Sequence, residues 1–236
     1  MQNIFKRYEQ KYLITPEQAG ALHGVLSRHM VPDSYGEYLV QNLYYDTENW
    51  DIIRACADKP PYKEKLRLRC YGVPGPDSEV FLELKKKYAG VVYKRRIAFP
   101  VSMLGGGSVR AAVSENSSQI ARELKFYLSA NPVFEKIYIS YRRRAFAGTA
   151  DEGLRVTFDA DIRFRTNSLD YFHPDIGQLI LPRGKTLMEI KTPGGIPVWM
   201  ARTLCEAKVF PATFSKYGAC YAAIADAEKR EVRISA

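Results

Sequence analysis

The sequence predicts an α+β fold: an eight-stranded antiparallel β-barrel tunnel with a charged lumen, covered on its outside by helices. Charged and apolar residues alternate along at least five segments, as in Lys65-Leu66-Arg67-Leu68-Arg69, and eight strand-like segments follow one another with short connections. Since side chains alternate between the two faces of a strand, each such segment has one ionic face and one apolar face. Closing the sheet into a barrel removes its unpaired edges.

Turn and capping signals divide the first half of the chain into elements. A strand over 4–14 ends at Thr15-Pro16-Glu17-Gln18, where Thr15 can cap a helix over about 16–29. A short helix starts at 46–49 and ends before Pro60-Pro61, and the prolines and glycines of 72–77 form a turn. The other strands of this half are expected over 38–45, 63–72, 79–88 and 91–99, the last two joined by a hairpin at Ala89-Gly90.

The second half of the chain continues this strand-rich order. A helix over about 117–129 ends at Asn131-Pro132, and strands over 134–146, 154–165 and 185–191 follow, with a loop over 166–184 before the last strand. Helices near 197–206 and 215–226 and a last strand at 229–235 complete the chain. The glycine run 105–107 lies among strands and lacks the form of a phosphate-binding P-loop, so we expect one domain over 1–236.

The helices indicate which face of the barrel points inward. Apolar residues at helical spacing, such as Ile120, Leu124 and Leu128, give these helices an apolar side that can cover an apolar barrel exterior. This includes the helix near 215–226, and the ionic face is then left to line the lumen. Because most of the ionic residues are Lys and Arg, which repel one another, the lumen is expected to bind a polyanion.

The overall composition agrees with a protein that binds anions. The 236 residues include 35 Lys and Arg against 26 Asp and Glu, a net charge of +9. The N-terminus has no apolar signal region, and no stretch approaches the roughly 18 apolar residues of a membrane span. The cysteines lack the spacing of a zinc site and are expected to be reduced thiols in the cytoplasm, with one extracytoplasmic disulfide as the alternative. They are Cys56, Cys70, Cys205 and Cys220.

Eight short motifs of charged and aromatic residues follow one another between residue 5 and about 225. They are Tyr-Glu-Gln-Lys-Tyr at 8–12, Lys-Leu-Arg-Leu-Arg-Cys-Tyr-Gly at 65–72, Leu-Glu-Leu-Lys at 82–85, Val-Tyr-Lys-Arg-Arg at 92–96, Tyr-Arg-Arg-Arg-Ala-Phe at 141–146, Leu-Arg-Val-Thr-Phe-Asp at 154–159, Met-Glu-Ile-Lys at 188–191 and Phe-Ser-Lys-Tyr at 214–217. Each motif is weak alone. In this order the series resembles the VTC domain, the polyphosphate polymerase branch of the CYTH-like triphosphate tunnel metalloenzymes.

The resemblance implies a tunnel that binds ATP and inorganic polyphosphate together with Mn²⁺ or Mg²⁺. In that branch the terminal phosphoryl group of ATP is added to a growing polyphosphate chain. Carried over by position, the catalytic residues are Lys11, Arg67, Arg69, Lys85 and Lys94, the phosphate-binding residues are Arg143, Arg155, Lys191 and Lys216, and the metal ligands are Glu189 with Glu9 and Glu83. Arg7 replaces the first Glu of the Glu-x-Glu-x-Lys motif of hydrolytic tunnel enzymes, which favours the polymerase.

These residue types suit phosphoryl transfer, which depends mainly on positioning and on the stabilisation of charge. Arg presents a planar fork to phosphate oxygens and Lys a point charge, while Mg²⁺ needs few carboxylates when phosphates complete its shell. Asp159 is a further possible carboxylate helper for the metal. The attacking phosphate oxygen is already ionised, and His23, His29 and His173 fall in the first helix and in the loop, so no histidine catalysis is expected.

Plainer interpretations stand beside these roles. Arg67 and Arg69 could be solvent-facing strand charges, Glu189 could form a simple ion pair with Lys191, and runs such as Lys85-Lys86-Lys87 usually form a solvated face. Within that run Lys86 points to the face opposite Lys85, so it is not expected to act.

Two other functions are left open at this point: a metal-dependent triphosphatase of the same tunnel fold, and a non-catalytic polyphosphate-binding module. Nucleic acid is not expected as a partner, because the aromatic residues that could stack on bases mostly alternate with the charges and so lie on the opposite face. The oligomeric state and a membrane-protein partner that receives the product are not visible in the sequence.

Overall fold

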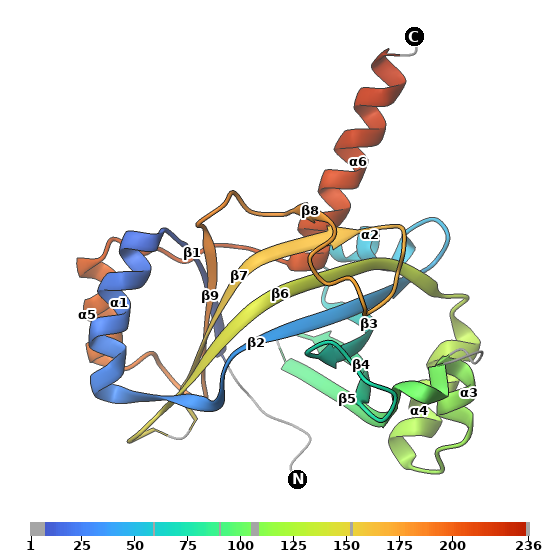
Figure 1. Ribbon diagram of the computed structural model, residues 1–236, viewed down its shortest axis with the longest axis horizontal. Coiled ribbons are helices and arrows are strands. Elements are labelled where there is room, and N and C mark those ends of the chain that lie inside the picture. Colours follow the sequence, from blue (N-terminus) through green and yellow to red (C-terminus); the bar gives the residue numbers. More distant parts are fainter. Residues whose placement is uncertain (1–7, 59, 90, 105–108, 152, 235–236) are drawn as a thin grey trace.

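The structure is a curved antiparallel sheet with helices gathered at its two ends (Figure 1). It is a computed structural model and describes residues 8–58, 60–89, 91–104, 109–151 and 153–234. Residues 4–7 of the expected first strand, Arg7 among them, and the glycine run 105–107 lie outside the described residues.

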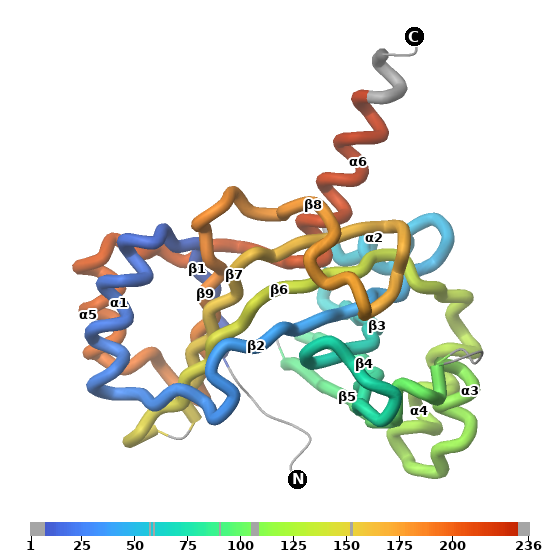
Figure 2. The backbone as a smooth tube through the Cα atoms, in the orientation of Figure 1, coloured from blue at the N-terminus to red at the C-terminus, as the bar shows by residue number. Residues whose placement is uncertain are grey.

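Eight strands form one continuous sheet in which every neighbouring pair is antiparallel. In spatial order they are β1 (Tyr8–Ile14), β9 (Thr186–Thr192), β7 (Arg155–Arg165), β6 (Phe134–Gly148), β2 (Met30–Asp46), β3 (Tyr62–Tyr71), β4 (Glu79–Tyr88) and β5 (Val91–Pro100). The path of the chain in Figure 2 shows the long strands β2, β6 and β7 bending together across the molecule. A ninth strand, β8 (Gln178–Leu179), pairs with β7 inside the segment 166–184, where the sequence predicts only a loop.

The prediction of a closed barrel is wrong. In the described part of the chain β1 and β5, the two ends of the sheet, form no hydrogen-bonded ladder with each other. Part of the free edge of β1 pairs instead with the segment before the last helix: the Ala212 amide donates to the Lys11 carbonyl oxygen (2.7 Å), and Tyr12 forms a bridge with Pro211. Some backbone hydrogen-bonding groups of this edge are therefore paired without closing the sheet, and the sheet forms a tunnel that is open on one side.

The capping signal at Thr15 is confirmed. The Gln18 amide donates to Thr15 Oγ1 (3.3 Å) and the Thr15 amide donates to Gln18 Oε1 (3.0 Å), which starts α1 (Pro16–His29) as a capping box. The helices α4 (Gln119–Ala130) and α5 (Val198–Glu206) lie close to their predicted ranges. The elements η1 (Val101–Leu104) and α3 (Val109–Ser114) are not predicted by the sequence. No helix of the described residues is long and apolar enough to cross a membrane.

Two helix boundaries differ from prediction. The helix α2 (Asp51–Ala57) begins later than 46–49, because Asp46 ends β2 and its carboxylate accepts hydrogen bonds from the amides of Ile52 and Ile53 (2.9 and 3.0 Å). The strand expected at 229–235 is wrong: α6 (Lys216–Ile234) continues through it, with residue 235 outside the described residues. From residue 226 to residue 230 the helix is exposed and meets no strand with which it could pair.

The apolar side of the sheet faces outward over most of its length, as predicted, and helices cover it. One core cluster joins Leu66, Leu68, Leu82 and Leu84 of β3 and β4 to α3 and α4. Another joins the apolar residues of β1, β7 and β9 to α1 and α5. The four leucines are at most 1% exposed, and replacing such a residue with alanine typically costs about 2–5 kcal/mol. The charged side of the sheet is thereby turned inward.

The helix α6 does not cover the outside of the sheet, which corrects the expectation for 215–226. Its Tyr217 and Cys220 pack with Val40, Tyr44 and Tyr141, which lie on the inner side of β2 and β6. The Tyr217 and Tyr44 rings are stacked, with their centroids 4.6 Å apart. The start of α6 therefore fills one end of the concave face, and Figure 1 shows the rest of the helix projecting away from the sheet.

A bulge interrupts the expected charge alternation along β7. The pairing of β6 with β7 shifts register between Ser140 and Arg142, and Asp161 opposite this shift has φ of 49°. Beyond the bulge Ile162 and Phe164 join the same inner cluster as Tyr44. Asp161 and Arg163 are therefore removed from the row of inward charges that begins at Arg155.

Candidate functional site

A cavity of about 390 Å³ lies on the concave side of the sheet, enclosed by strands from both halves of the chain and by the start of α6. Nine of its lining residues are cationic and two are carboxylates. The cations are Lys11, Lys65, Arg67, Arg69, Lys85, Lys94, Arg143, Lys191 and Lys216, and the carboxylates are Glu9 and Glu189. The alternation on β3 explains the placement, because Lys65, Arg67 and Arg69 share the face opposite the buried leucines.

A first ion-pair group surrounds Glu83 on β4, which is 1% exposed. The Nε and a terminal nitrogen of Arg67 donate to Glu83 Oε2 (2.9 and 2.8 Å), and Lys94 Nζ lies 2.5 Å from Oε1. Burial would raise the pKa of Glu83, but Arg67, Arg69 and Lys94 more than offset it and hold that pKa well below its usual range. Glu83 is therefore a fixed counter-ion that orients two cations of the wall.

A second group lies at the start of α6. Arg143 binds Asp159 with two hydrogen bonds (2.6 and 2.8 Å), and Lys216 Nζ lies 2.6 Å from Asp159 and 3.4 Å from Glu189. Lys191 donates to the second oxygen of Glu189 at 2.8 Å. Burial would raise the pKa of Glu189, yet these cations lower it well below its usual value. Burial would likewise lower the pKa of Lys216, and the two carboxylates raise it instead, so the group stays ionised.

A third group links β1 to β4, and Lys65 of β3 lies apart from it. Glu9 lies 3.5 Å from Lys11 Nζ and 3.9 Å from Lys85 Nζ. Lys65 has no carboxylate within salt-bridge distance among the described residues and donates to Ser215 Oγ (3.1 Å). Burial, reinforced by the charges of Lys85 and Lys11, lowers the pKa of Lys65 to about 8. The wall thus carries cations that are not neutralised internally, which is the expected electrostatic state of an anion-binding site.

The carboxylates can be tested as ligands for the divalent ion that the sequence implies. In the described residues no group of three or more His, Cys, Asp or Glu gathers as a preformed metal site. Glu9 and Glu189 both line the cavity and flank Lys11 Nζ, at 3.5 and 3.8 Å. Mg²⁺ commonly takes one or two carboxylates and completes its shell with phosphates and water. These two residues fit an ion that arrives with its phosphate ligands, whereas the enclosed Glu83 does not.

Ten of the twelve predicted site residues line the cavity, and two do not. Glu83 is enclosed by Arg67 and Lys94 and does not line the cavity. Arg155 is exposed at the first position of β7, where it pairs with Ala147 and Lys191 at the end of the sheet. Lys86 points outward, as predicted, and donates to Glu123 of α4 (2.8 Å), which also accepts from Arg95 (2.7 Å).

The sequence does not identify several residues that the structure places at the site. Lys65 follows the same alternation as Arg67, so the sequence does carry a signal for it. Asp159 is predicted only as a helper for the metal, whereas in the structure it is a buried partner of Arg143 and Lys216. The aromatic and polar residues of the wall carry no comparable signal. They are Tyr44, Val92, Tyr141, Ser215 and Tyr217. His23, His29 and His173 are not among the residues that line the cavity.

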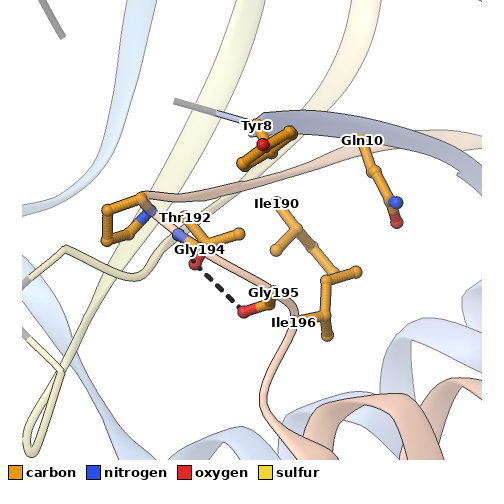
Figure 3. A pocket seen from close by; sticks show the side chains of 8 residues that line it. Tyr8, Gln10, Ile190, Thr192, Gly194, Gly195 and Ile196 are labelled. Carbon is orange, nitrogen blue, oxygen red and sulfur yellow. Dashed lines mark hydrogen bonds between the residues drawn. The ribbon is translucent and has the colours of Figure 1, made fainter. Parts of the chain in front are cut away.

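A second cavity, of about 530 Å³, lies at the ends of β1 and β9 (Figure 3). Tyr8 and Gln10 of β1 line it together with Ile190 and the turn 193–196. Thr192 Oγ1 donates to the Gly195 carbonyl oxygen (3.2 Å) and fixes that turn. The residues that line this cavity include no charged side chain, so the cationic cavity is the stronger candidate for a functional site.

Comparison with solved structures finds similar folds. A proposed adenylyl cyclase from Hippeastrum, described as having a dominant triphosphatase activity, shares 18% identity at a TM-score of 0.53, with 89% of this chain and 92% of that chain covered. A proposed adenylate cyclase from Vibrio parahaemolyticus shares 10% identity at a TM-score of 0.48, with 92% and 98% covered. At these identities the likeness concerns the fold alone, and the Hippeastrum protein is the one with the higher TM-score.

Comparison with families and with curated proteins gives two further findings. No curated protein matches the chain. The family profile described as the VTC domain matches residues 6–225, which span all the strands and the cationic cavity. The order of charged motifs and the inward cationic wall agree with this match. The chain belongs to the VTC domain family.

Proposed function

We propose that this protein is a polyphosphate polymerase that transfers the terminal phosphoryl group of ATP to a growing polyphosphate chain. The cavity wall carries the proposal: nine cations and two carboxylates face one space. The carboxylates Glu9, Glu189, Glu83 and Asp159 offset four of the nine cations, and a bound divalent ion would add two positive charges to the remaining five, which together exceed the charge of a single triphosphate group. The surplus suits a donor triphosphate and an acceptor phosphate chain held side by side, which is the substrate pair of a polymerase.

The side chains would act by positioning and by charge stabilisation. Arg67, Arg69 and Arg143 are already oriented by Glu83, Asn42 and Asp159, so their remaining N–H groups can bind phosphate oxygens without reorganisation. Lys11, Lys85 and Lys94 add point charges. A divalent ion bound near Glu189 and Glu9 would neutralise charge on the transferring group. The acceptor oxygen is ionised in solution, so no general base is required.

A triphosphatase is the second candidate function. The likeness in fold to a Hippeastrum protein with a described triphosphatase activity favours it. In such an enzyme water would replace the acceptor phosphate, and the same cationic wall would stabilise the transferring group.

The length of the phosphate products separates these functions. The protein is incubated with ATP and Mn²⁺ or Mg²⁺, and the products are resolved by chain length. Long polyphosphate is the expected result. Release of only free phosphate would replace the polymerase by the triphosphatase, and tight polyphosphate binding without turnover would show a binding module.

The inward and outward cations should differ in their effect on phosphate binding. Arg67→Ala is expected to weaken binding of inorganic tripolyphosphate on the order of 10-fold or more, because it removes a charge-assisted fork from the wall. Lys86→Ala is the matched control, since Lys86 pairs with Glu123 outside the cavity. Titration calorimetry measures both affinities. Equal losses in the two variants would indicate a diffuse basic surface instead of a lined cavity.

A further inference from the structure

Four aromatic rings form a row beside the cationic cavity, across strands β2, β3 and β4. Tyr35 and Tyr38 have centroids 5.9 Å apart, Tyr38 and Tyr71 6.1 Å, and Tyr71 and Phe81 5.8 Å. Neighbouring rings are tilted or perpendicular to each other, the usual geometry of packed aromatic pairs. We call these four residues the aromatic row.

The aromatic row is continuous with the charged wall. On β3, Tyr71 is the next inward-facing residue after Arg69, about 7 Å along the strand. An Arg69 guanidinium nitrogen lies 3.4 Å from the Tyr71 hydroxyl oxygen, which accepts its hydrogen bond. On β4, Phe81 stands two residues from Glu83, and the Arg96 guanidinium lies 3.6 Å above its ring. These four rings are exceptions to the expectation that the aromatic residues mostly lie opposite the charges.

Two residues of the aromatic row are exposed and the other two, Tyr38 and Phe81, are partly buried, unlike the enclosed aromatic residues next to α6. Tyr35 is 77% exposed and Tyr71 40%, whereas Tyr44 is 6% and Tyr141 2% exposed. Those two buried rings pack against α6 and serve the core. Tyr35 and Tyr71 leave apolar ring area open to solvent next to the cation Arg69, which is a combination suited to a ligand with both an aromatic and an anionic part.

We propose that the aromatic row binds the base of a nucleoside triphosphate whose phosphates lie in the cationic cavity. Every nucleobase has a π-face that stacks on aromatic rings and on guanidinium planes, without a requirement for sequence-specific hydrogen bonds. A ribose separates the base from the first phosphate, and Tyr71 and Arg69 are separated by a comparable step of one inward-facing residue. The nucleotide is then oriented with its base at the row and its phosphate chain directed inward, past Arg69 toward Arg67.

This inference rests on the proposed function and deepens it, because it assigns residues that bind the base of the nucleotide donor. The row distinguishes a nucleoside triphosphate from inorganic triphosphate, which carries no base. Purines, which offer the larger stacking surface, are expected to bind more tightly than pyrimidines.

The test compares two ligands that share the triphosphate group. Titration calorimetry measures the binding of ATP and of inorganic tripolyphosphate to wild-type protein and to Tyr71→Ala. The variant is expected to lose roughly 10-fold in affinity for ATP, the scale of one stacked base, and to keep its affinity for tripolyphosphate. Tyr71→Phe keeps the ring and should bind ATP as the wild type does.

The matched control is Tyr88→Ala, which removes a tyrosine that is 58% exposed and faces outward near the end of β4. Unchanged ATP affinity in Tyr71→Ala, or an equal loss for both ligands, would overturn the base site while leaving the phosphate site in place. Failure of the wild type to bind either ligand would instead refute the proposed function and the base site together.

Discussion

Replacing Glu189 with alanine is expected to reduce metal-dependent turnover of ATP on the order of 100-fold or more. Glu189 lines the cavity and is the carboxylate that we propose holds a divalent ion against bound phosphates, whose charge that ion would neutralise. Product formation is measured against Mn²⁺ and Mg²⁺ concentration. The isosteric variant Glu189→Gln should show the same loss, since it keeps the shape of the side chain and removes its charge.

The fold should survive this change, because Lys216 keeps its 2.6 Å contact with Asp159 when Glu189 is removed. Circular dichroism and urea unfolding check this point. Glu123→Ala, on the outer face, is the control and should retain full turnover. A Glu189→Gln variant with wild-type activity and an unchanged metal requirement would refute the metal assignment.

Removal of the Asp159 carboxylate is expected to cost about 3–5 kcal/mol in the free energy of unfolding. Asp159 is 0% exposed and is the buried partner of both Arg143 and Lys216, so Asp159→Ala leaves Arg143 without its counter-ion and Lys216 with only its 3.4 Å contact to Glu189. Urea unfolding measures the loss. Inorganic tripolyphosphate should restore part of it, because an anion that binds only the folded state stabilises that state.

Glu123→Ala provides the comparison for a partly exposed ion pair. Glu123 contacts Lys86 and Arg95 on the outer face, and pairs of this kind contribute at most about 1 kcal/mol. An Asp159→Ala variant as stable as Glu123→Ala would show that Arg143 and Lys216 find other partners or water, and that the buried group is not a structural requirement.

The sequence predicts the wall of the site well because period-two alternation is a local property. Placing Arg67 and Arg69 inward requires only that β3 be a strand with Leu66 and Leu68 packed outside. The function of Glu83 depends on more than its face. Its direct neighbours across the sheet are Arg67 and Arg96, and that register is fixed by strand pairing over long range. Alternation alone could not distinguish an enclosed counter-ion from a free metal ligand.

The errors in the predicted fold also arise where a local pattern does not determine the structure. A last strand is predicted over 229–235, but so short a segment also fits the continuation of the helix that begins at Lys216. A bulge at Asp161 adds one residue and exchanges the faces of β7 beyond it, which no composition reveals. The aromatic row was missed even though Tyr71 shares the inward spacing of Arg69.

The open side of the tunnel has a consequence for a polymer product. In the described chain β1 and β5, the two ends of the sheet, share no ladder, and Glu9 of β1 instead contacts Lys85 of the neighbouring strand β4, 3.9 Å away, with both side chains partly exposed. Parting such a pair costs at most about 1 kcal/mol, whereas parting a strand ladder breaks several hydrogen bonds of about 0.5–1.5 kcal/mol each. Separating the two ends of the sheet, β1 and β5, therefore costs less free energy than separating any two paired strands. In the proposed polymerase a long phosphate chain would then leave laterally without being unthreaded, and added salt, which screens the Glu9–Lys85 pair, would make this opening easier.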